Sequence, residues 1–388
     1  MMKKNLKFGL IGAGFIGRTH ALAIHAARQV FTDLEYLPVA QMLCEVSPAL
    51  AEKAARNLGF EQFTDDWRKL VDTVDAVVVA VPSHLHREIA LYALASGKHL
   101  LCEKPVGLNS QEVEQIQAAA NQSTACHAVG FTYARAPMVI FAKRMVDDGK
   151  LGRLLHFSGR HDEDYLAGPS TPFTWRQESK IAGRFGVLGD LGYHILSIGR
   201  MLCGEIRAVC GLTETFYPER KDVSGALRTV ENEDYAAFLG RFTSGGAGTF
   251  ESSRVARGSK QNLSFELAGE AGTIRFSAER LNELQFYSAS DESSTEGFRK
   301  ILINAAHQPY DSFIPAPGHG LGFNDLKTIE IGQFVTAIAE QRRCPPDLAD
   351  AYAISKICEA VLQSHTEQRW VVLKRTAEKG NPTEDPKR

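Results

Sequence analysis

Three side chains could together move a proton to or from a substrate. Asp190 and His194 stand four residues apart, so both lie on one face if the segment is helical. The carboxylate could then orient the imidazole and stabilise its charged form, as a general acid or base requires. Lys104 follows a predicted strand and could polarise a carbonyl or share the proton of an alcohol. The alternative is that all three are ordinary structural or surface side chains.

A glycine loop near the start of the chain has the spacing of a dinucleotide-binding turn. Gly12-Ala13-Gly14-Phe15-Ile16-Gly17 directly follows a buried strand and opens a helix. Gly12 permits the tight turn, Gly14 lets the backbone approach a pyrophosphate, and Gly17 lets helix and strand pack closely. Glycine turns are common, but the position in the first strand–turn–helix unit favours phosphate binding over a purely structural turn.

Glu45 stands at the C-terminal end of the second predicted strand, residues 37–44. A carboxylate there can accept both ribose hydroxyls of an adenosine and repels a 2′-phosphate. No lysine or arginine follows until Lys53. The pattern therefore favours NAD over NADP, the alternative being that Glu45 only caps its loop.

The elements that would position these residues change in type near residue 150. The first part alternates short apolar strands with helical segments, which predicts a doubly wound parallel sheet of the Rossmann type. Its strands are expected at 7–11, 37–44, 75–81 and 98–102, and its helices at 47–58, 85–96 and 111–122.

The second part has short strands separated by glycine or polar turns, several of them alternating apolar and polar residues. It is predicted to be an α+β domain with one broad, mostly antiparallel open sheet. Its strands are expected at 154–161, 206–216, 234–242, 248–255, 263–267 and 273–277, and its helices at 192–202, 325–340 and 348–367. The predicted division is residues 1–131 for dinucleotide binding, 132–375 for substrate binding and oligomerisation, and 376–388 as a flexible tail.

Composition excludes several classes of partner. The formal net charge of -2 leaves no global field for nucleic acid or an anionic membrane surface. No apolar stretch approaches the ~20 residues of a membrane span. Seven scattered cysteines without a Cys-x-x-Cys pair favour reduced thiols over disulfides or a metal site. We expect a cytoplasmic protein without a metal. We also expect it to self-associate as a dimer or tetramer through the sheet of residues 206–289, which has Phe250 and Val255 in its solvent-facing strands.

Several motifs in a fixed order make the sequence resemble the Gfo/Idh/MocA family of NAD(P)-dependent oxidoreductases. The resemblance covers nearly the whole chain, and its motifs are the glycine loop, Val81-Pro82-Ser83-His84-Leu85-His86, Glu103-Lys104-Pro105, Val129-Gly130-Phe131, Asp190-x-Gly-x-His194 and Arg369-Trp370-Val371. Family members typically oxidise or reduce a secondary alcohol on a sugar, glycoside or cyclitol. The resemblance implies that His194 is the acid/base, Asp190 its orienter, and Lys104 a hydrogen-bond donor that tunes the proton relay.

The resemblance also implies the residues that contact the cofactor and the substrate. The glycine loop, with Phe15 and Ile16, and Glu45 are expected to contact the cofactor. Further cofactor contacts are expected from Val81, Pro82, His84, His86, Glu103, Lys104, Trp175 and Arg176. Residues 160–176 are rich in side chains that recognise hydroxyls, and they look like those of levoglucosan- and glycoside-type dehydrogenases in the family, which favours a pyranose-like substrate. Substrate contacts are expected from His161, Asp164, Tyr165, Tyr193, His194, His319 and Asn324.

Alternatives remain open at the sequence level. The 160–165 run could be a solvated acidic loop, and 318–325 a plain helix entry capped by Asn324 or Asp325. Ser197 replaces an Asp common in the family, and residues 131–135 differ from its Asn-containing version. Besides a dehydrogenase, the sequence admits an NAD-dependent glycosidase that oxidises, eliminates and reduces back, or a non-catalytic NAD or sugar sensor.

Overall fold

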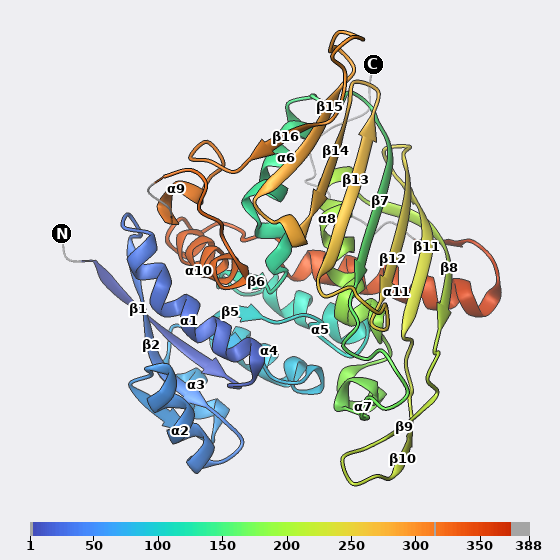
Figure 1. Cartoon of the computed structure of the whole chain (residues 1–388). Coiled ribbons are helices and arrows are strands. Elements are labelled where there is room, and N and C mark those ends of the chain that lie inside the picture. The colour runs from blue at the N-terminus through green and yellow to red at the C-terminus, as the bar shows by residue number, and fades with distance from the viewer. Residues whose placement is uncertain (1–2, 314–315, 374–388) are drawn as a thin grey trace, which may run out of the picture.

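The computed structural model describes residues 3–313 and 316–373. Its first sheet has six parallel strands in the order β3-β2-β1-β4-β5-β6, the doubly wound arrangement predicted (Figure 1). The strands are β1 (Lys4–Ile11), β2 (Tyr36–Cys44), β3 (Gln62–Thr64), β4 (Ala76–Val79), β5 (His99–Cys102) and β6 (His127–Val129). The tail predicted over 376–388 lies outside the described residues.

Local signals account for the helices that cover this sheet. Ser47 caps α2 (Pro48–Leu58) by accepting the Leu50 N–H, and Asn109 caps α5 (Ser110–Ala120) by accepting the Glu112 N–H. Gly59, at φ +73°, ends α2 in the left-handed conformation that glycine adopts without strain. The remaining helices here are α1 (Phe15–Val30), α3 (Trp67–Thr73) and α4 (His86–Ala95).

The second sheet has nine strands in the order β16-β15-β14-β13-β7-β12-β11-β8-β17. It is antiparallel except that β7 and β12 run parallel, so the sheet is mixed. The strands are β7 (Leu154–Asp162), β8 (Ile206–Glu214), β11 (Tyr235–Phe242), β12 (Ala247–Ser253), β13 (Asn262–Gly269), β14 (Gly272–Ser277), β15 (Glu283–Ser288), β16 (Arg299–Leu302) and β17 (Val371–Val372). A separate hairpin pairs β9 (Glu219–Lys221) with β10 (Leu227–Thr229).

The two faces of the nine-stranded sheet differ in character. One face packs against α8 (Tyr193–Cys203) and α11 (Leu348–Glu367), where Phe250 stacks on Phe238 with ring centroids 4.7 Å apart. Phe250 is 2% exposed, so the expectation that it faces solvent is wrong: strand alternation turns it into the core. Val255 is half-buried and follows the end of β12.

Helix α10 (Phe323–Ala339) comes late in the chain but packs on the first sheet. Its Phe334 is fully buried and meets the ring of Phe8 in β1 edge-on at 6.3 Å. Figure 1 shows α10 beside α1, between the two sheets. A segment of the second half thereby reaches the edge of the first sheet where the parallel strands end. The other helices are α6 (Pro137–Asp147), α7 (Ser179–Ala182) and α9 (Tyr310–Phe313).

In the part of the chain that the structure describes, no helix combines the length and the apolar character needed to cross a membrane.

Candidate active site

The glycine loop lies between β1 and α1 in a conformation that fits a dinucleotide. Gly12 has φ +94° and donates its N–H to the Cys44 carbonyl at 3.0 Å. A Cβ on Gly17 would come within 2.0 Å of the Gly12 carbonyl oxygen, whereas a Cβ on Gly14 would meet nothing within 4 Å. No side chain of the described residues caps α1, so its first N–H groups are free to bind phosphate oxygens.

Glu45 lies beside this loop, as the sequence predicts. Its Oε1 accepts the Ala13 N–H at 2.7 Å and its Oε2 accepts the Val46 N–H at 3.1 Å. Among the described side chains, no lysine, arginine or histidine forms an ion pair with it. The carboxylate therefore presents an uncompensated negative charge where an adenosine ribose would lie. In the same loop Ile16 is half-buried, and Phe15 is 74% exposed.

Lys104 meets Asp190 where the two halves of the chain join. Its Nζ donates to the Asp190 carbonyl oxygen at 2.6 Å and lies 3.5 Å from Oδ1. Tyr165 donates its hydroxyl to Asp190 Oδ2, and Arg176 Nε is 3.6 Å from the same oxygen. Burial would raise the pKa of the Asp190 carboxyl, but the two cations and the tyrosine outweigh it and lower that pKa to about 2. Asp190 is therefore a carboxylate at neutral pH.

Asp190, predicted to orient His194, contacts other partners in the structure. Residues Leu188–Gly192 form a π-helical turn, and α8 begins only at Tyr193. The prediction that Asp190 and His194 lie on one helix face assumed a regular α-helix through both residues. A π-helical turn takes the place of the first part of that helix. The oxygens of Asp190 bind Lys104, Tyr165 and Arg176 instead. Across the described chain, no hydrogen bond or ion pair joins Asp190 to His194.

His194 is a nearly buried imidazole, 8% exposed. Its Nδ1 is buried without a hydrogen-bond partner among the described residues. Its ring lies edge-on to Tyr133, with centroids 4.9 Å apart, and 5.6 Å from that of His161. Burial, followed by the positive charge of Lys104 and by His161, lowers the pKa of His194 well below its usual value. The imidazole is neutral at pH 7 and can accept a proton.

The loops predicted to line the cofactor are joined by His86. This buried histidine contacts the Val81 carbonyl through Nε2 at 2.7 Å and the Pro105 carbonyl through Nδ1 at 2.8 Å. Burial lowers the pKa of His86, although both carbonyls favour its protonated form. Pro82 precedes a short 3₁₀ turn and His84 is exposed. His86 thus ties the end of one strand to the loop that carries Lys104.

Glu103 points into the protein. Its carboxylate binds His20 Nε2 at 2.7 Å and the ammonium of Lys327, both buried. Burial opposes its ionisation, but Lys327 and His20 lower the pKa of this carboxyl well below its usual value. His20, Glu103 and Glu330 have oxygen and nitrogen atoms close enough for a metal, but the Lys327 ammonium lies among them.

The structure brings some of the predicted substrate residues to the Lys104–Asp190 pair and places others elsewhere. Tyr165 binds Asp190, and His161 lies beside His194 with Nδ1 donating to the Leu191 carbonyl at 3.0 Å. Arg176 pairs with Asp190 and lies 4.7 Å from the ring centroid of Trp175, which brings Trp175 close to the Lys104–Asp190 pair.

Asp164 instead binds Lys260 at 2.8 Å and the Gly258 N–H at 3.1 Å. Tyr193 is fully buried against Phe131, which corrects its assignment as a substrate contact: adjacent helical residues point in different directions, so only His194 faces the site.

His319 and Asn324 are exposed, and neither is hydrogen-bonded to Lys104, Asp190 or His194 within the described chain. The helix entry is capped at Gly322, whose N–H donates to the Asp325 carboxylate at 2.8 Å. Ser197, the departure noted in the sequence, is buried in α8.

Three contributors were missed by sequence reasoning. Tyr133 lies against His194, and Phe323 at the start of α10 stacks on Phe15 with ring centroids 6.3 Å apart. Lys327 is the third: a lysine on the buried side of α10, next to Leu326 and three residues before Glu330. That isolated charged pair was the signal available in the sequence, because charges on a buried helix face need partners.

Comparison with known proteins agrees with this geometry. Residues 6–131 match the oxidoreductase family with an NAD-binding Rossmann fold, and residues 139–275 match the GFO/IDH/MocA C-terminal domain. Levoglucosan dehydrogenase of Pseudarthrobacter phenanthrenivorans is 38% identical over 383 residues, which cover 95% of this chain and 98% of that protein. The scyllo-inositol 2-dehydrogenase (NAD(+)) of Bacillus subtilis is 27% identical over 301 residues, 75% of this chain and 80% of that one.

A solved structure of levoglucosan dehydrogenase in complex with NADH and levoglucosan has a TM-score of 0.93 to this chain. The two are 37% identical, and the match covers 96% of this chain and 100% of the other. Both halves, the glycine loop and the Lys104–Asp190 pair therefore have one explanation: the chain belongs to the GFO/IDH/MocA family of oxidoreductases, whose N-terminal Rossmann fold binds NAD.

Proposed function

We propose that the protein is an NAD-dependent dehydrogenase of a secondary ring hydroxyl on a sugar or cyclitol, with an anhydropyranose such as levoglucosan as the first candidate. The observation that carries the proposal is the meeting of Lys104 with Asp190, close to a neutral His194. The extent of the match to levoglucosan dehydrogenase supports the substrate class. Residues 1–131 would bind the dinucleotide, and residues 132–375 the sugar.

The side chains can divide the proton chemistry as follows. Bound NAD supplies the hydride acceptor when an alcohol is oxidised. His194, neutral because burial and Lys104 lower its pKa, accepts the hydroxyl proton at Nε2, since Nδ1 is buried. The Lys104 ammonium donates a hydrogen bond to the same oxygen and stabilises its developing negative charge. For the reverse reaction, His194 must first be protonated.

Asp190 serves this scheme through Lys104. An ionised carboxylate 3.5 Å from the Lys104 ammonium attracts it and limits the directions in which it can point. The same carboxylate holds Tyr165 and Arg176, whose hydroxyl and guanidinium groups suit the polar edge of a pyranose. Asp190 therefore positions a donor set around the reacting hydroxyl.

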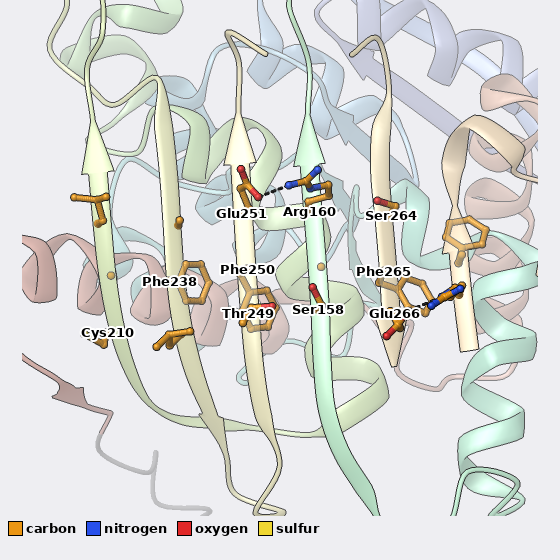
Figure 2. A pocket seen from close by; sticks show the side chains of 17 residues that line it. Ser158, Arg160, Cys210, Phe238, Thr249, Phe250, Glu251, Ser264, Phe265 and Glu266 are labelled. Carbon is orange, nitrogen blue, oxygen red and sulfur yellow. Dashed lines mark hydrogen bonds and ion pairs between the residues drawn. The ribbon is translucent and has the colours of Figure 1, made fainter. Parts of the chain in front are cut away.

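We also propose that the chain self-associates through the outer face of the nine-stranded sheet. A hollow of about 690 Å³ lies there, opposite the face that packs on α8. Figure 2 shows Ser158, Thr249 and the Arg160–Glu251 pair on this surface, and Leu212 and Leu239 are 45% and 49% exposed beside them. A second copy of the chain that covered this open face would bury the exposed leucines, which is favourable.

The seven free thiols support a cytoplasmic location.

The proposed reaction predicts net reduction of NAD. Purified protein with NAD and a panel of anhydrosugars, pyranoses, glycosides and inositols should show absorbance of reduced nicotinamide with at least one ring alcohol, levoglucosan first. A glycosidase would release product with no net absorbance change, and a sensor would bind without turnover. Either result would overturn the proposal.

Glu45 should make the enzyme prefer NAD to NADP. A 2′-phosphate would face an unpaired carboxylate, a cost of about 1–3 kcal/mol in transition-state stabilisation. We expect kcat/KM to be at least ~5-fold higher with NAD, and Glu45→Ala to reduce that ratio. Glu52→Ala, on the exposed face of α2, is the matched control and should leave the ratio unchanged. Equal use of NADP by the unmodified protein would contradict this assignment.

Removing the imidazole of His194 should abolish the proton transfer while sparing cofactor binding. His194→Ala is expected to lower kcat by ~10²–10⁴-fold, the usual contribution of a general base. The dissociation constant of the reduced cofactor, measured by its fluorescence, should change little because the residues of the first domain hold the dinucleotide. Oxidation should also decline only at pH below the usual histidine range, where the depressed pKa of His194 lies. Near-normal turnover, or loss of NAD binding, would refute the role.

Self-association can be tested at Leu239. Light scattering should report a mass above that of the 42.6 kDa chain at micromolar concentration. Leu239→Glu should shift the protein toward the monomer because a carboxylate would be buried unpaired in the interface. Leu22→Glu, exposed on α1, should leave the mass unchanged. A monomeric wild-type protein would rule out this surface as an interface.

A further inference from the structure

Five buried ionisable side chains form a cluster behind the loop that carries Lys104. They come from four separate elements and are between 0% and 6% exposed. We call them the Lys327 cluster, and its members are His20 in α1, Glu103 after β5, Arg135 in a 3₁₀ turn, and Lys327 and Glu330 in α10. None of them was assigned a catalytic role above.

The Lys327 ammonium is at the centre of this cluster. It donates to Glu330 Oε1 at 2.9 Å and to Glu103 Oε1. His20 Nε2 lies 2.7 Å from the same Glu103 oxygen, so it must carry the proton and donate it. Arg135 Nε is 3.6 Å from Glu330 Oε2. Two carboxylates thus face two permanent cations and the cluster is neutral when His20 is neutral.

Glu103 connects this cluster to the catalytic lysine. Its Oε2 accepts the backbone N–H of Lys104 at 3.3 Å. A Cβ on Gly130 would lie 2.5 Å from both carboxylate oxygens, so the side chain is packed closely against the end of β6. Any rearrangement of the Glu103 carboxylate would therefore be transmitted directly to Lys104.

We propose that Lys327 is a positioning residue of the dehydrogenase reaction: its buried ammonium balances Glu103 and Glu330, and so holds the Glu103–Lys104 loop and sets the charge that His194 experiences. The proposal rests on the proposed function for its kinetic consequences. Its structural basis is the contact geometry of the cluster, which does not depend on the identity of the substrate.

His194 experiences charge from several elements. Lys104 in the loop after β5 and His161 in β7 both act on its pKa, and the Tyr133 ring lies 4.9 Å from its ring. The ionised Asp190 stands in the π turn that precedes α8. Lys327 in α10 also lowers the pKa of His194, although its effect is smaller than those of burial, Lys104 and His161. Without the Lys327 ammonium, Glu330 would keep only Arg135 as a partner and Glu103 only His20. The lost positive charge and the less compensated carboxylates would both raise the pKa of His194.

The test is Lys327→Met, a substitution of similar length that removes the charge. We expect kcat to fall at least ~10-fold, because Lys104 is displaced, while the dissociation constant of NAD changes less than ~3-fold. The acid limb of the rate profile should move to higher pH by ~0.5–1 unit, since oxidation needs neutral His194 and its pKa rises. NMR titration of labelled histidine rings should show the same direction for His194 without any substrate.

A second variant separates charge from packing. Lys327→Met combined with Glu330→Gln restores the net charge of the cluster, with Glu103 as its remaining carboxylate and Arg135 as its remaining cation, and should return the His194 titration toward the wild-type value. Lys327→Arg keeps the charge and should retain much of the wild-type profile if it folds. Lys356→Met, on the exposed side of α11, is the matched control and should change nothing.

The outcomes distinguish this proposal from the proposed function. A wild-type protein that oxidises no sugar contradicts the function, while the NMR titration still tests Lys327. If the His194 titration in Lys327→Met is the same as in wild type, or if the double variant is no closer to wild type than the single one, Lys327 has only a packing role and the proposal is overturned.

Discussion

Opposite charges, some buried and some partly buried, hold the candidate site together where the two halves of the chain meet. Lys104 leaves the end of the first sheet and pairs with Asp190 from the second half, while Lys327 of α10 pairs with Glu103. Lys327 and Glu103 are both buried, and removing one partner of such a pair costs about 3–5 kcal/mol, because the charge that remains is poorly solvated and has lost a counter-ion. The position of the reactive groups therefore depends on both halves being docked, with α10 packed on the first sheet.

The same charges set the protonation states that the chemistry needs. Asp190 remains ionised because Lys104 and Arg176 overcome the effect of its burial. His194 remains neutral because burial and Lys104 act on it in the same direction. Lys104 thus favours both a charged carboxylate and an uncharged imidazole within a single site, which suits removal of a proton from an alcohol.

The nine-stranded sheet separates the two functions proposed for the second half. Its inner face, with His161, lies against α8 and His194, while its outer face carries Leu212, Leu239 and the Arg160–Glu251 pair. Because adjacent strand residues point to opposite faces, β7 can contribute His161 to the site and Arg160 to the outer surface. Changes that alter self-association need not alter the catalytic groups.

The sequence by itself determined the features that follow local rules. The glycine loop after the first strand, Glu45 after the second strand and the alternation of strands and helices all depend on neighbouring residues, and the structure confirms them. Only the tertiary structure decided that Asp190 binds Lys104 and Tyr165 and not His194, since a π turn replaces the expected α-helix. It likewise turned Phe250 inward and placed Lys327 against Glu103, 224 residues away in sequence. Such contacts are set by packing between distant segments, and no pattern of neighbouring residues records them.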